Sequence, residues 1–416
     1  MSLTYQAARR RILDQVRPLE AETVPLLEAL GRAIAEPLMA TLDLPRFDNS
    51  AMDGYALRAA DSGAGATLRV TGYLLAGSLE RPTVEPGCAV RIMTGAPLPP
   101  GADTVVPEED TDGGAAVVTL RGAAVRGAHI RTRGEDIRSG EEVLPLGTVL
   151  RPPEISLLAS FNRSSVQVVR RPRVAILSTG DELVEVGTEL TEGRIVNSNS
   201  WALAAAVLEL GGIPLQLGIA RDTRESLREK LAQGLQADML ITSAGVSAGD
   251  LDLVREVLKE LGVEQVFWKV DIKPGRPIAF AVKGAVPVFS LPGNPVATLV
   301  TFEEFVRPAL LKMLGQKQIL KPLLRARLQE PARKKPGRAQ FLRVRVQEEN
   351  GVLIATSSGD QNTGILRTSL RANGIAVLPA EKGNYAAGDE VEVHLLGRDA
   401  EWLSGAAIET ESEALT

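Results

Sequence analysis

The feature that most constrains the fold is a regular alternation of strand-like and helix-like segments between Arg173 and about Gly315. "RVAILSTG" is typical of a buried strand, and "SWALAAAVLELGG" is typical of a helix that ends at glycines. Further strands are predicted at "IPLQLGIA", "ADMLITSAG", "QVFWKV", "PIAFAV" and "PVFSLPG", and further helices at "TRESLREKLAQGL", "DLVREVLKELG" and "VATLVTFEEFVRPALLKML". Because parallel neighbours are joined by crossover helices, the pattern predicts a doubly wound, mainly parallel α/β domain with helices on both faces.

The segments on either side of this domain are rich in short strand-like runs. From about Glu28 to Leu146 the chain is dense in glycine and proline, and runs such as "TLRVTGYLLAG" predict a β-rich module. The helix-like pieces "TYQAARRRILDQVRPL" and "PPEISLLASFN" flank this module and are expected to pack together, which would make it an insertion. After Pro322, "AQFLRVRVQEENGVLIATSS" carries an Asn350-Gly351 hairpin signal and predicts a small barrel or sandwich.

These patterns divide the chain into six predicted segments. They are an N-terminal linker-domain helix (1–27), a β-rich inserted module (28–146), a return segment of the linker domain (147–172), the α/β domain (173–321), a C-terminal β-barrel domain (322–398) and an acidic tail (399–416) that is expected to be disordered. A chain of 416 residues is long enough for roughly two to four domains, so the division is reasonable in size.

Composition narrows the possible chemistry. A single cysteine, Cys88, excludes an intramolecular disulfide and any multi-thiolate metal site, and the two histidines, His129 and His394, are far apart in sequence. The net charge of -5 and the aromatic content of 4% argue against general nucleic-acid binding. The arginine-rich start does not resemble a signal peptide, and no apolar run reaches the ~18 residues of a membrane span. We therefore expect a cytoplasmic protein without membrane or nucleic-acid contacts.

Polar residues follow most of the predicted strands of the α/β domain. Ligands of open α/β sheets bind outside the carboxyl ends of the strands, so these loops predict a site. The loops contribute Ser178, Thr179, Asp181, Glu182, Asp222, Ser243, Ser247, Asp250, Asp252, Lys269, Lys273, Arg276, Ser290 and Asn294. The glycine-rich "AGVSAGD" and "PGNP" lead into helices and offer backbone N–H groups to an anion, with Asn294 at the N-cap and Pro295 at the first helical position.

The charged residues suit phosphate and a metal ion. Lys273 and Arg276 favour an oxyanion, and Asp222, Asp250 and Asp252 are the hard oxygen ligands that Mg²⁺ takes alongside substrate phosphates. Structural roles are equally open at this point. The aspartates can cap or complement helix N-termini, and the other charged residues can occupy ordinary surface turns. Recurrence of charged loops after most strands favours the phosphate-and-metal site. There is no P-loop motif, and no dinucleotide fingerprint follows the first strand.

Seven motifs together resemble one family. They are "LPRFDNSAMDGYAL", "RIMTGAPLPPGADTVVPEE", "LSTGDEL", "GRIVNSNS", "TSAGVSAGDLD", "IKPGRP" and "FSLPGNPVA". Their order is similar to that of the molybdopterin molybdenumtransferases, whose eukaryotic relatives include the E domain of gephyrin, from near the N-terminus to about Leu396. A shorter resemblance, over the α/β segment alone, is to molybdopterin adenylyltransferases and other molybdenum-cofactor-binding domains.

The resemblance implies an enzyme that takes adenylylated molybdopterin and molybdate. With Mg²⁺ such an enzyme hydrolyses the phosphoanhydride, releases AMP and inserts molybdenum into the dithiolene. The implied catalytic residues are Asp53, Thr94, Glu182, Lys269, Lys273, Arg343 and Thr363, and the implied metal ligands are Asp222 and Asp252 with Asp250 as their neighbour. The implied cofactor-binding residues are Ser178, Thr179, Gly180, Asp181, Ser243, Gly245, Val246, Ser247, Gly249, Pro274, Gly275, Arg276, Pro292, Gly293 and Asn294.

The resemblance also implies an assembly. Family members resemble elongated homodimers in which the inserted module of one subunit faces the α/β domain of the other, so Asp53 and Thr94 would act across the interface. In "FDNSAMDGYAL" the residues Asp48, Asn49 and Ser50 are then turn formers that hold the loop. Further implied partners are a molybdopterin adenylyltransferase and downstream molybdoenzyme chaperones.

Two positions depart from the family pattern. Ala244 stands where glycine is common, so a left-handed backbone there would be strained. Thr363 stands where serine is common, and the hydroxyl is retained. Two other functions stay open, namely a tungstate-inserting relative and a cofactor-binding scaffold without turnover.

Overall fold

The computed structural model describes residues 3–244 and 251–397, with the backbone alone at positions 251 and 252. The acidic tail predicted at 399–416 lies outside the described residues. Two compact units are present. Unit 1 comprises Met1–Ala35, Gly147–Arg151 and Ser165–Thr416, and unit 2 comprises Glu36–Leu146 and Pro152–Ser164. No helix in the described ranges is both long and apolar enough to cross a membrane.

Unit 1 is built on a six-stranded sheet with the order β15-β12-β16-β20-β19-β17. The strands are β12 (Arg173–Thr179), β15 (Ile213–Ala220), β16 (Met239–Ser243), β17 (Glu264–Phe267), β19 (Ala279–Lys283) and β20 (Val286–Leu291). The first four strands in this order pair in parallel, and β19 and β17 are antiparallel additions at one edge. The mainly parallel sheet predicted from the alternating pattern is therefore confirmed.

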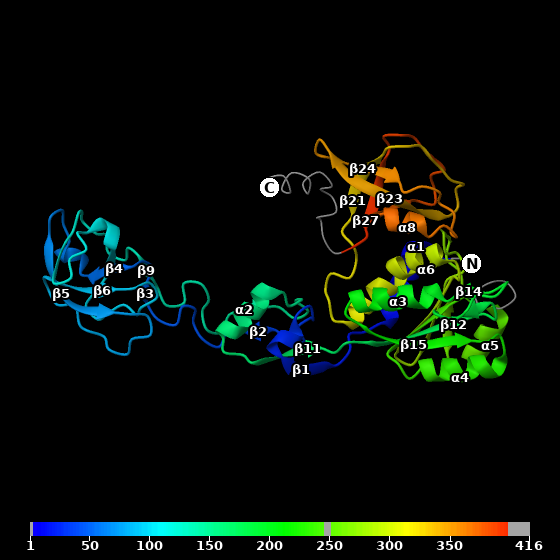
Figure 1. Ribbon diagram of the computed structural model, residues 1–416, viewed down its shortest axis with the longest axis horizontal. Helices are drawn as coiled ribbons and strands as arrows, with labels where there is room; N and C mark the ends of the chain where they lie inside the picture. Colours follow the sequence, from blue (N-terminus) through cyan, green and yellow to red (C-terminus); the bar gives the residue numbers. More distant parts are fainter. Residues whose placement is uncertain (1–2, 245–250, 398–416) are drawn as a thin grey trace. The chain divides into compact units, whose positions relative to one another are not determined.

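Helices cover both faces of this sheet, as the continuous apolar strands require. In β12 the side chains of Val174 and Ile176 enter one core and those of Ala175 and Leu177 enter the other, because successive residues of a strand point to opposite faces. On one face lie α3 (Ser198–Glu209) and α6 (Pro295–Thr301), and on the other α4 (Arg224–Gly234) and α5 (Leu251–Glu260), as Figure 1 shows. The long helix predicted after "PGNP" is α6, a π-helical turn (Phe302–Val306) and α7 (Arg307–Met313) in succession.

The C-terminal part of unit 1 is a closed barrel. Its strands are β21 (Leu324–Leu328), β23 (Ala339–Glu349), β24 (Val352–Ser357), β25 (Gly374–Leu378) and β27 (Glu390–Leu395), followed around the barrel as β23-β24-β21-β27-β25 and closed by pairing of β25 with β23. Positive φ angles of 52° at Asn350 and 79° at Gly351 form the turn between β23 and β24, as the Asn-Gly pair predicts. The short strand β18 (Ile272–Lys273) pairs with β23 and attaches the barrel to the α/β domain.

The barrel and the α/β domain also share a buried joint. Helix α1 (Tyr5–Gln15) buries Tyr5, whose ring packs edge-on to Phe305 and Phe341 with centroids 6.2 and 5.2 Å away. Burial, together with the nearby Glu304, raises the pKa of Tyr5 to about 12. His394 Nδ1 lies 2.9 Å from Glu304 Oε1, and both side chains are buried. One core therefore runs from α1 through the π-helical turn into the barrel.

Strands, rather than the two predicted helices, join the segments that flank the inserted module. β1 (Ala21–Pro25) pairs antiparallel with β11 (Ser165–Val169) in unit 1. The buried face of α1 belongs to the joint described above, and α2 (Pro152–Ser160) belongs to unit 2.

Unit 2 contains a five-stranded sheet with the order β7-β4-β6-β5-β8. Its strands are β4 (Gly54–Leu57), β5 (Thr67–Leu74), β6 (Cys88–Ile92), β7 (Thr104–Pro107) and β8 (Val117–Thr119), and two buried clusters cover its faces. The β-rich character predicted for this segment is evident.

The short elements of both units complete the description. They are β2 (Leu38–Met39), β3 (Asn49–Ser50), β9 (Ile130–Arg131), β10 (Glu142–Leu144), β13 (Leu183–Val184), β14 (Ile195–Val196), β22 (Ala332–Arg333), β26 (Asn384–Tyr385), α8 (Arg367–Arg371) and the 3-10 turns Leu26–Ala29, Ala59–Asp61 and Glu108–Asp110.

Candidate functional site

The carboxyl ends of four parallel strands meet at one edge of the unit 1 sheet. β12, β15, β16 and β20 end at Thr179, Ala220, Ser243 and Leu291, so the loops that follow them lie at the same edge. The chain leaves β12 toward β15 on one side, and β16 lies on the other side of β12. This reversal is the topological switch point at which α/β sheets bind ligands.

A pocket of about 460 Å³ opens at this edge. The sequence-predicted residues that line it are Ser178, Glu182, Ser243, Pro292, Gly293 and Asn294. The lining residues that were not predicted are Leu183, Ile195, Val196, Asn197, Ser198, Asn199, Ala244, Pro277 and Pro295. Most of the additions come from "GRIVNSNS", a motif that carries the family resemblance but received no site assignment. We call this cavity the sheet-edge pocket.

Two asparagines tie the floor of the sheet-edge pocket together. Ser178 Oγ donates to Asn197 Oδ1 at 2.7 Å, and Asn197 is the N-cap of α3, where its Oδ1 also accepts from Ser200 N at 3.4 Å. Asn199 Nδ2 donates to Ser243 Oγ at 2.9 Å and to the Gly293 carbonyl at 2.7 Å. The pocket therefore links three strand ends through neutral hydrogen bonds.

One buried donor in this network has no acceptor among the residues that the structure describes. Asn197 Nδ2 is inaccessible to solvent, and no acceptor for it occurs in the described ranges. A buried polar group of this kind costs free energy unless it is paired. An oxygen of a bound ligand is the natural acceptor. Sequence reasoning missed both asparagines because Asn beside a helix start is an ordinary capping residue.

Backbone geometry restricts the loop after β16. Ala244 has a φ of 70°, so this position adopts the left-handed region, where alanine is strained. A Cβ at Gly293 would lie 3.2 Å from the Ala244 Cβ, so the two loops approach each other closely. Five of the predicted cofactor-binding and metal positions that follow, Gly245, Val246, Ser247, Gly249 and Asp250, lie outside the described residues, as does the side chain of Asp252.

The acidic residues after β12 and β15 lie side by side. The Asp222 backbone N–H donates to Asp181 Oδ1 at 3.4 Å. Thr223, rather than Asp222, is the N-cap of α4, and its side chain accepts from Ser226 N at 3.3 Å. The capping role that the sequence left open for Asp222 is thus filled by its neighbour. Gly180 has a φ of 141°, and a Cβ there would lie 2.5 Å from the Glu182 carboxylate.

The described acids do not form a complete metal cage on their own. No group of three or more His, Cys, Asp or Glu side chains in residues 3–244 and 253–397 is arranged to hold a metal ion. Mg²⁺ typically needs only one or two carboxylates, because substrate phosphates and water supply its other ligands. The Asp181 and Asp222 pair therefore fits such an ion in its chemistry.

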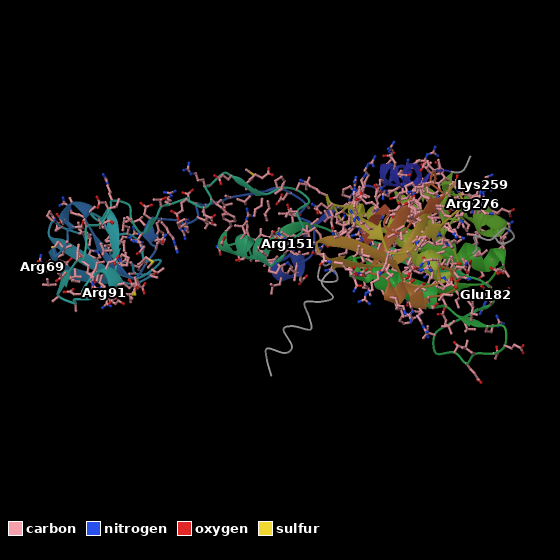
Figure 2. The ribbon with its side chains drawn as sticks, turned by 90° about the horizontal axis from the view of Figure 1, so that it is seen from above. Arg69, Arg91, Arg151, Glu182, Lys259 and Arg276 are labelled. Atoms are coloured by element: carbon pink, nitrogen blue, oxygen red, sulfur yellow. The ribbon has the colours of Figure 1, made fainter. Side chains whose placement is uncertain are left out.

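The predicted basic residues lie on the segment 269–277. Different residues of this segment line two different pockets. Pro277 lines the sheet-edge pocket, whereas Lys273 in β18 lines a different one beside the barrel. Arg276 Nε lies 4.0 Å from Asp271 Oδ1, and the Lys269 carbonyl accepts from Leu3 N at 3.4 Å. Figure 2 shows the side chains of Glu182 and Arg276 on unit 1.

The predicted barrel residue Thr363 contacts the sheet-edge pocket through Asn294. Asn294 occupies the predicted N-cap position of α6, but its side chain makes no capping bond and instead donates from Nδ2 to Thr363 Oγ1 at 3.1 Å. Arg343 is buried and holds the loop that carries Thr363, with Nη2 donating to the carbonyls of Asp360 at 3.0 Å and Asn362 at 3.3 Å. Burial lowers the pKa of Arg343. Thr363 thus touches a pocket residue, and Arg343 acts through the loop.

In unit 2 the two predicted residues bond each other. Asp53 Oδ1 accepts from both the backbone N and the Oγ1 of Thr94, each at 2.7 Å, and these two bonds lower the pKa of Asp53. Two of the three neighbours predicted to be turn formers, Asn49 and Ser50, instead form β3, which pairs with β9. Asp48 Oδ1 accepts from Arg133 N at 2.7 Å, and Ser50 Oγ bonds the Met52 carbonyl at 2.5 Å.

Comparisons with known proteins agree across the whole chain. Residues 3–162 match the family described as MoeA N-terminal region (domain I and II), residues 175–312 a probable molybdopterin binding domain, and residues 325–396 the MoeA C-terminal region (domain IV). A molybdopterin molybdenumtransferase from Haemophilus influenzae is 38% identical over 407 residues, covering 95% of this chain and all of the relative. Molybdopterin molybdenumtransferase 2 from Mycobacterium tuberculosis is 38% identical, covering 94% of this chain and 98% of the relative.

A solved structure agrees in fold as well. The crystal structure of a molybdopterin biosynthesis MoeA protein from a Pyrococcus species superposes with a TM-score of 0.83 at 32% identity, covering 96% of this chain and 100% of that one. The comparison extends over both units and the barrel.

Proposed function

The chain belongs to the molybdopterin molybdenumtransferase family, and from this premise we propose that it inserts molybdate into adenylylated molybdopterin with release of AMP. Family membership makes the protein a transferase of molybdenum cofactor biosynthesis. The substrate form, the leaving group and a dependence on Mg²⁺ are the parts that we propose.

The observation that carries the proposal is the sheet-edge pocket at the switch point. Its floor presents neutral donors and acceptors from Ser178, Asn197, Asn199 and Ser243, which suit the heteroatom-rich rings of a pterin nucleotide. The unpaired Asn197 Nδ2 adds a buried donor for a ligand oxygen. The volume of about 460 Å³ lies in the range of small-molecule sites.

We assign the acids two tasks. Glu182, which lines the sheet-edge pocket, would accept a proton from the water that attacks the AMP phosphorus, while the anhydride P–O bond breaks and the pterin phosphate leaves with the bonding electrons. Asp181 and Asp222, with Asp252 as predicted from the sequence, would hold Mg²⁺ on the phosphates. The ion would supply charge neutralisation at the phosphate oxygens.

The cations and the barrel loop would position the oxyanions. Lys269, Lys273 and Arg276 would balance phosphate or molybdate charge, an electrostatic effect of about 3 kcal/mol for a well-placed group. Thr363, bonded to Asn294, would offer its hydroxyl at the rim, and Arg343 would fix the loop that carries it.

We also propose that the active site is shared in a homodimer. Asp53 and Thr94 bond each other in unit 2, so the carboxylate is held in a defined orientation for a site on another subunit. A cytoplasmic location, a molybdopterin adenylyltransferase that supplies the substrate and chaperones that accept the product complete the proposal.

An assay of AMP release tests the proposed reaction. Protein with adenylylated molybdopterin and Mg²⁺ should release AMP when molybdate is added, and parallel assays with tungstate separate a tungstate-inserting relative. A scaffold without turnover would release none with either oxyanion. Absence of AMP in all assays would contradict the proposal.

Single substitutions test which residues are needed for AMP release. Glu182→Gln should reduce AMP release about 100-fold or more if Glu182 is the base, because general-base catalysis typically contributes at least that factor. Glu189→Gln, which changes an exposed acid further along the same connection, is the matched control and should retain wild-type release.

Lys273→Ala and Asp252→Ala should keep the fold and lose AMP release. Normal turnover in both variants would contradict the assignments.

The shared site has its own test. Asp53→Ala and Asp252→Ala subunits, each inactive alone, are mixed, dissociated and reassembled. Mixed dimers should regain AMP release at one intact composite site. If no activity returns, the two residues do not act across a subunit interface.

A further inference from the structure

A second pocket, of about 610 Å³, lies in unit 1 where β18 pairs with β23. Its lining residues are Lys273, Arg333, Lys334, Lys335, Pro336, Arg338 and Gln340. Five of these seven side chains are basic, although the whole chain carries a net charge of -5. We call this cavity the cationic pocket.

The positive charges of the cationic pocket have little acidic compensation. No carboxylate of the described chain forms an ion pair with Lys273, Arg333, Lys335 or Arg338. Lys334 donates from Nζ to the carbonyls of Arg338 at 3.1 Å and Ala380 at 3.4 Å, and the charge of Glu381 acts on it from nearby. Like charges that lie close together repel, and an anion bound among them lowers this repulsion.

The loop that presents these charges is anchored by its backbone. Lys334 N donates to the Gly383 carbonyl at 3.1 Å and Gly337 N donates to the Ala380 carbonyl at 2.8 Å. Gly337 has a φ of 101°, which a residue with a side chain rarely adopts. On the other wall, β18 fixes Lys273 beside Gln340 through strand pairing. The basic side chains therefore start from a fixed backbone.

A single segment connects the two pockets. Lys273 lines the cationic pocket and Pro277, four residues later, lines the sheet-edge pocket. Since an extended chain spans at most ~3.5 Å per residue, the Cα atoms of these two residues are at most about 14 Å apart. Neither Arg276 nor Arg343 lines the cationic pocket, so its charge is additional to theirs.

We propose that the cationic pocket is a separate anion-binding subsite for a ligand that carries tetrahedral oxyanion groups. Basic side chains suit such groups, because arginine forms paired hydrogen bonds with phosphate-type oxygens and lysine adds a point charge. The volume exceeds that of one small ion, and five cations exceed what one dianion neutralises. A ligand with more than one oxyanion group fits best. The identity of the ligand rests on the proposed function, whereas the existence of the subsite does not.

Two sources could supply this chemistry in the proposed reaction. One is free molybdate, and the other is the phosphate of the pterin nucleotide. Calorimetric titration of the full chain with molybdate, inorganic phosphate and pyrophosphate separates them. Tightest binding of molybdate identifies the free oxyanion, and tightest binding of pyrophosphate identifies linked phosphate groups.

The variant Arg333→Gln/Arg338→Gln removes two charges from the cationic pocket. We expect it to weaken the tightest of these anions about 10- to 100-fold, as loss of charge-assisted hydrogen bonds predicts. The matched control is Arg327→Gln/Arg345→Gln, which removes two exposed arginines from barrel strands outside the pocket. The control should bind like wild type, and both variants should melt like wild type.

Either of two results would overturn the proposal. One is the absence of saturable anion binding by the wild-type protein at low salt. The other is an equal loss of affinity in both double variants, which would indicate a diffuse charge effect. If anion binding follows the prediction but the wild-type protein releases no AMP from adenylylated molybdopterin, the subsite stands and the proposed function fails.

Discussion

The two pockets of unit 1 are opposites in how their polar groups are satisfied. In the sheet-edge pocket, Ser178, Asn197, Asn199 and Ser243 bond one another or the backbone, and one buried amide donor, Asn197 Nδ2, has no acceptor in the described part of the chain. In the cationic pocket, none of the five basic side chains forms an ion pair with a carboxylate of the described chain.

This difference means that the sheet-edge pocket is suited to recognise the shape of a ligand, whereas the cationic pocket is suited to recognise its charge. A network of short neutral side chains is rigid and costs no desolvation of charge, so it can recognise a ring system by position. Unpaired cations on a fixed loop recognise charge and are tolerant of ligand shape. The shared segment 273–277 places both kinds of recognition within reach of one extended substrate.

The largest expected effect comes from Gly275→Ala, which strains the segment 273–277 that both pockets share. Gly275 has a φ of 91°, and a Cβ there would lie 2.3 Å from Thr301 Cγ2. Strain and overpacking should lower the free energy of unfolding by about 2–4 kcal/mol. Urea unfolding checks this, and AMP and pyrophosphate binding should both weaken.

Gly364→Ala is the control for that change, because its nearest neighbour outside the adjacent residues is 3.7 Å away and its φ is not positive. It should unfold like wild type. Unchanged stability of Gly275→Ala would mean that the segment can move, and the two pockets would then not be rigidly linked.

Next in size is Asn199→Ala, which breaks the neutral network alone. Loss of the bonds to Ser243 and Gly293 should weaken AMP binding about 10- to 100-fold, because the buried Ser243 hydroxyl loses its donor and the pocket loses the link between β16 and the Gly293 loop. Asn199→Asp should be at least as harmful despite its equal size, since a carboxylate cannot donate to the Gly293 carbonyl. Wild-type AMP affinity in Asn199→Asp would show that the donor is unimportant.

A smaller effect is expected from Arg343→Lys, which keeps the charge but loses the guanidinium fork. The carbonyls of Asp360 and Asn362 and the hydroxyl of Thr368 would lose their donor. We expect faster hydrogen exchange in residues 360–363 and about 10-fold slower AMP release. Arg345→Lys, two residues along the same strand and exposed, is the control. Equal hydrogen-exchange rates for residues 360–363 in the two variants would contradict the positioning role of Arg343.

The smallest effect is expected from Thr94→Val in unit 2. The carboxyl of Asp53 has a lowered pKa because Thr94 donates through its backbone N and then its Oγ1, so the charge persists to lower pH than in an ordinary aspartate. This stabilisation is present above the unfolded pKa of about 3.9 and is lost as pH falls through the folded pKa. Thr94→Val keeps the backbone donor and should raise the pKa of Asp53 part of the way. An unchanged carboxyl titration by NMR would rule out the hydroxyl bond.

The sequence predicted the sheet well because its signal is local. The continuous apolar run in "RVAILSTG" requires burial on both faces, and the intervening helices allow few other arrangements. The sequence singled out Ala244 as a departure from the family pattern where a left-handed backbone would be strained, and the structure shows that backbone there.

The parts that escaped prediction depend on tertiary pairing. Lys273 and Arg333 are sixty positions apart, and the pairing of β18 with β23 brings Lys273 beside Gln340, close to the loop that carries Arg333. Asn197 and Asn199 resembled capping residues, because the strands that they connect are distant in sequence. The bond from Asn294 to Thr363 likewise requires the barrel to meet α6.

A crossed binding experiment tests the division between the two pockets most directly. Dissociation constants for AMP and for pyrophosphate are measured with wild type, Asn199→Ala and Arg333→Gln/Arg338→Gln. We predict that Asn199→Ala weakens AMP at least 10-fold and leaves pyrophosphate unchanged, and that the double variant does the reverse. Equal weakening of both ligands by either variant would contradict the existence of two distinct subsites.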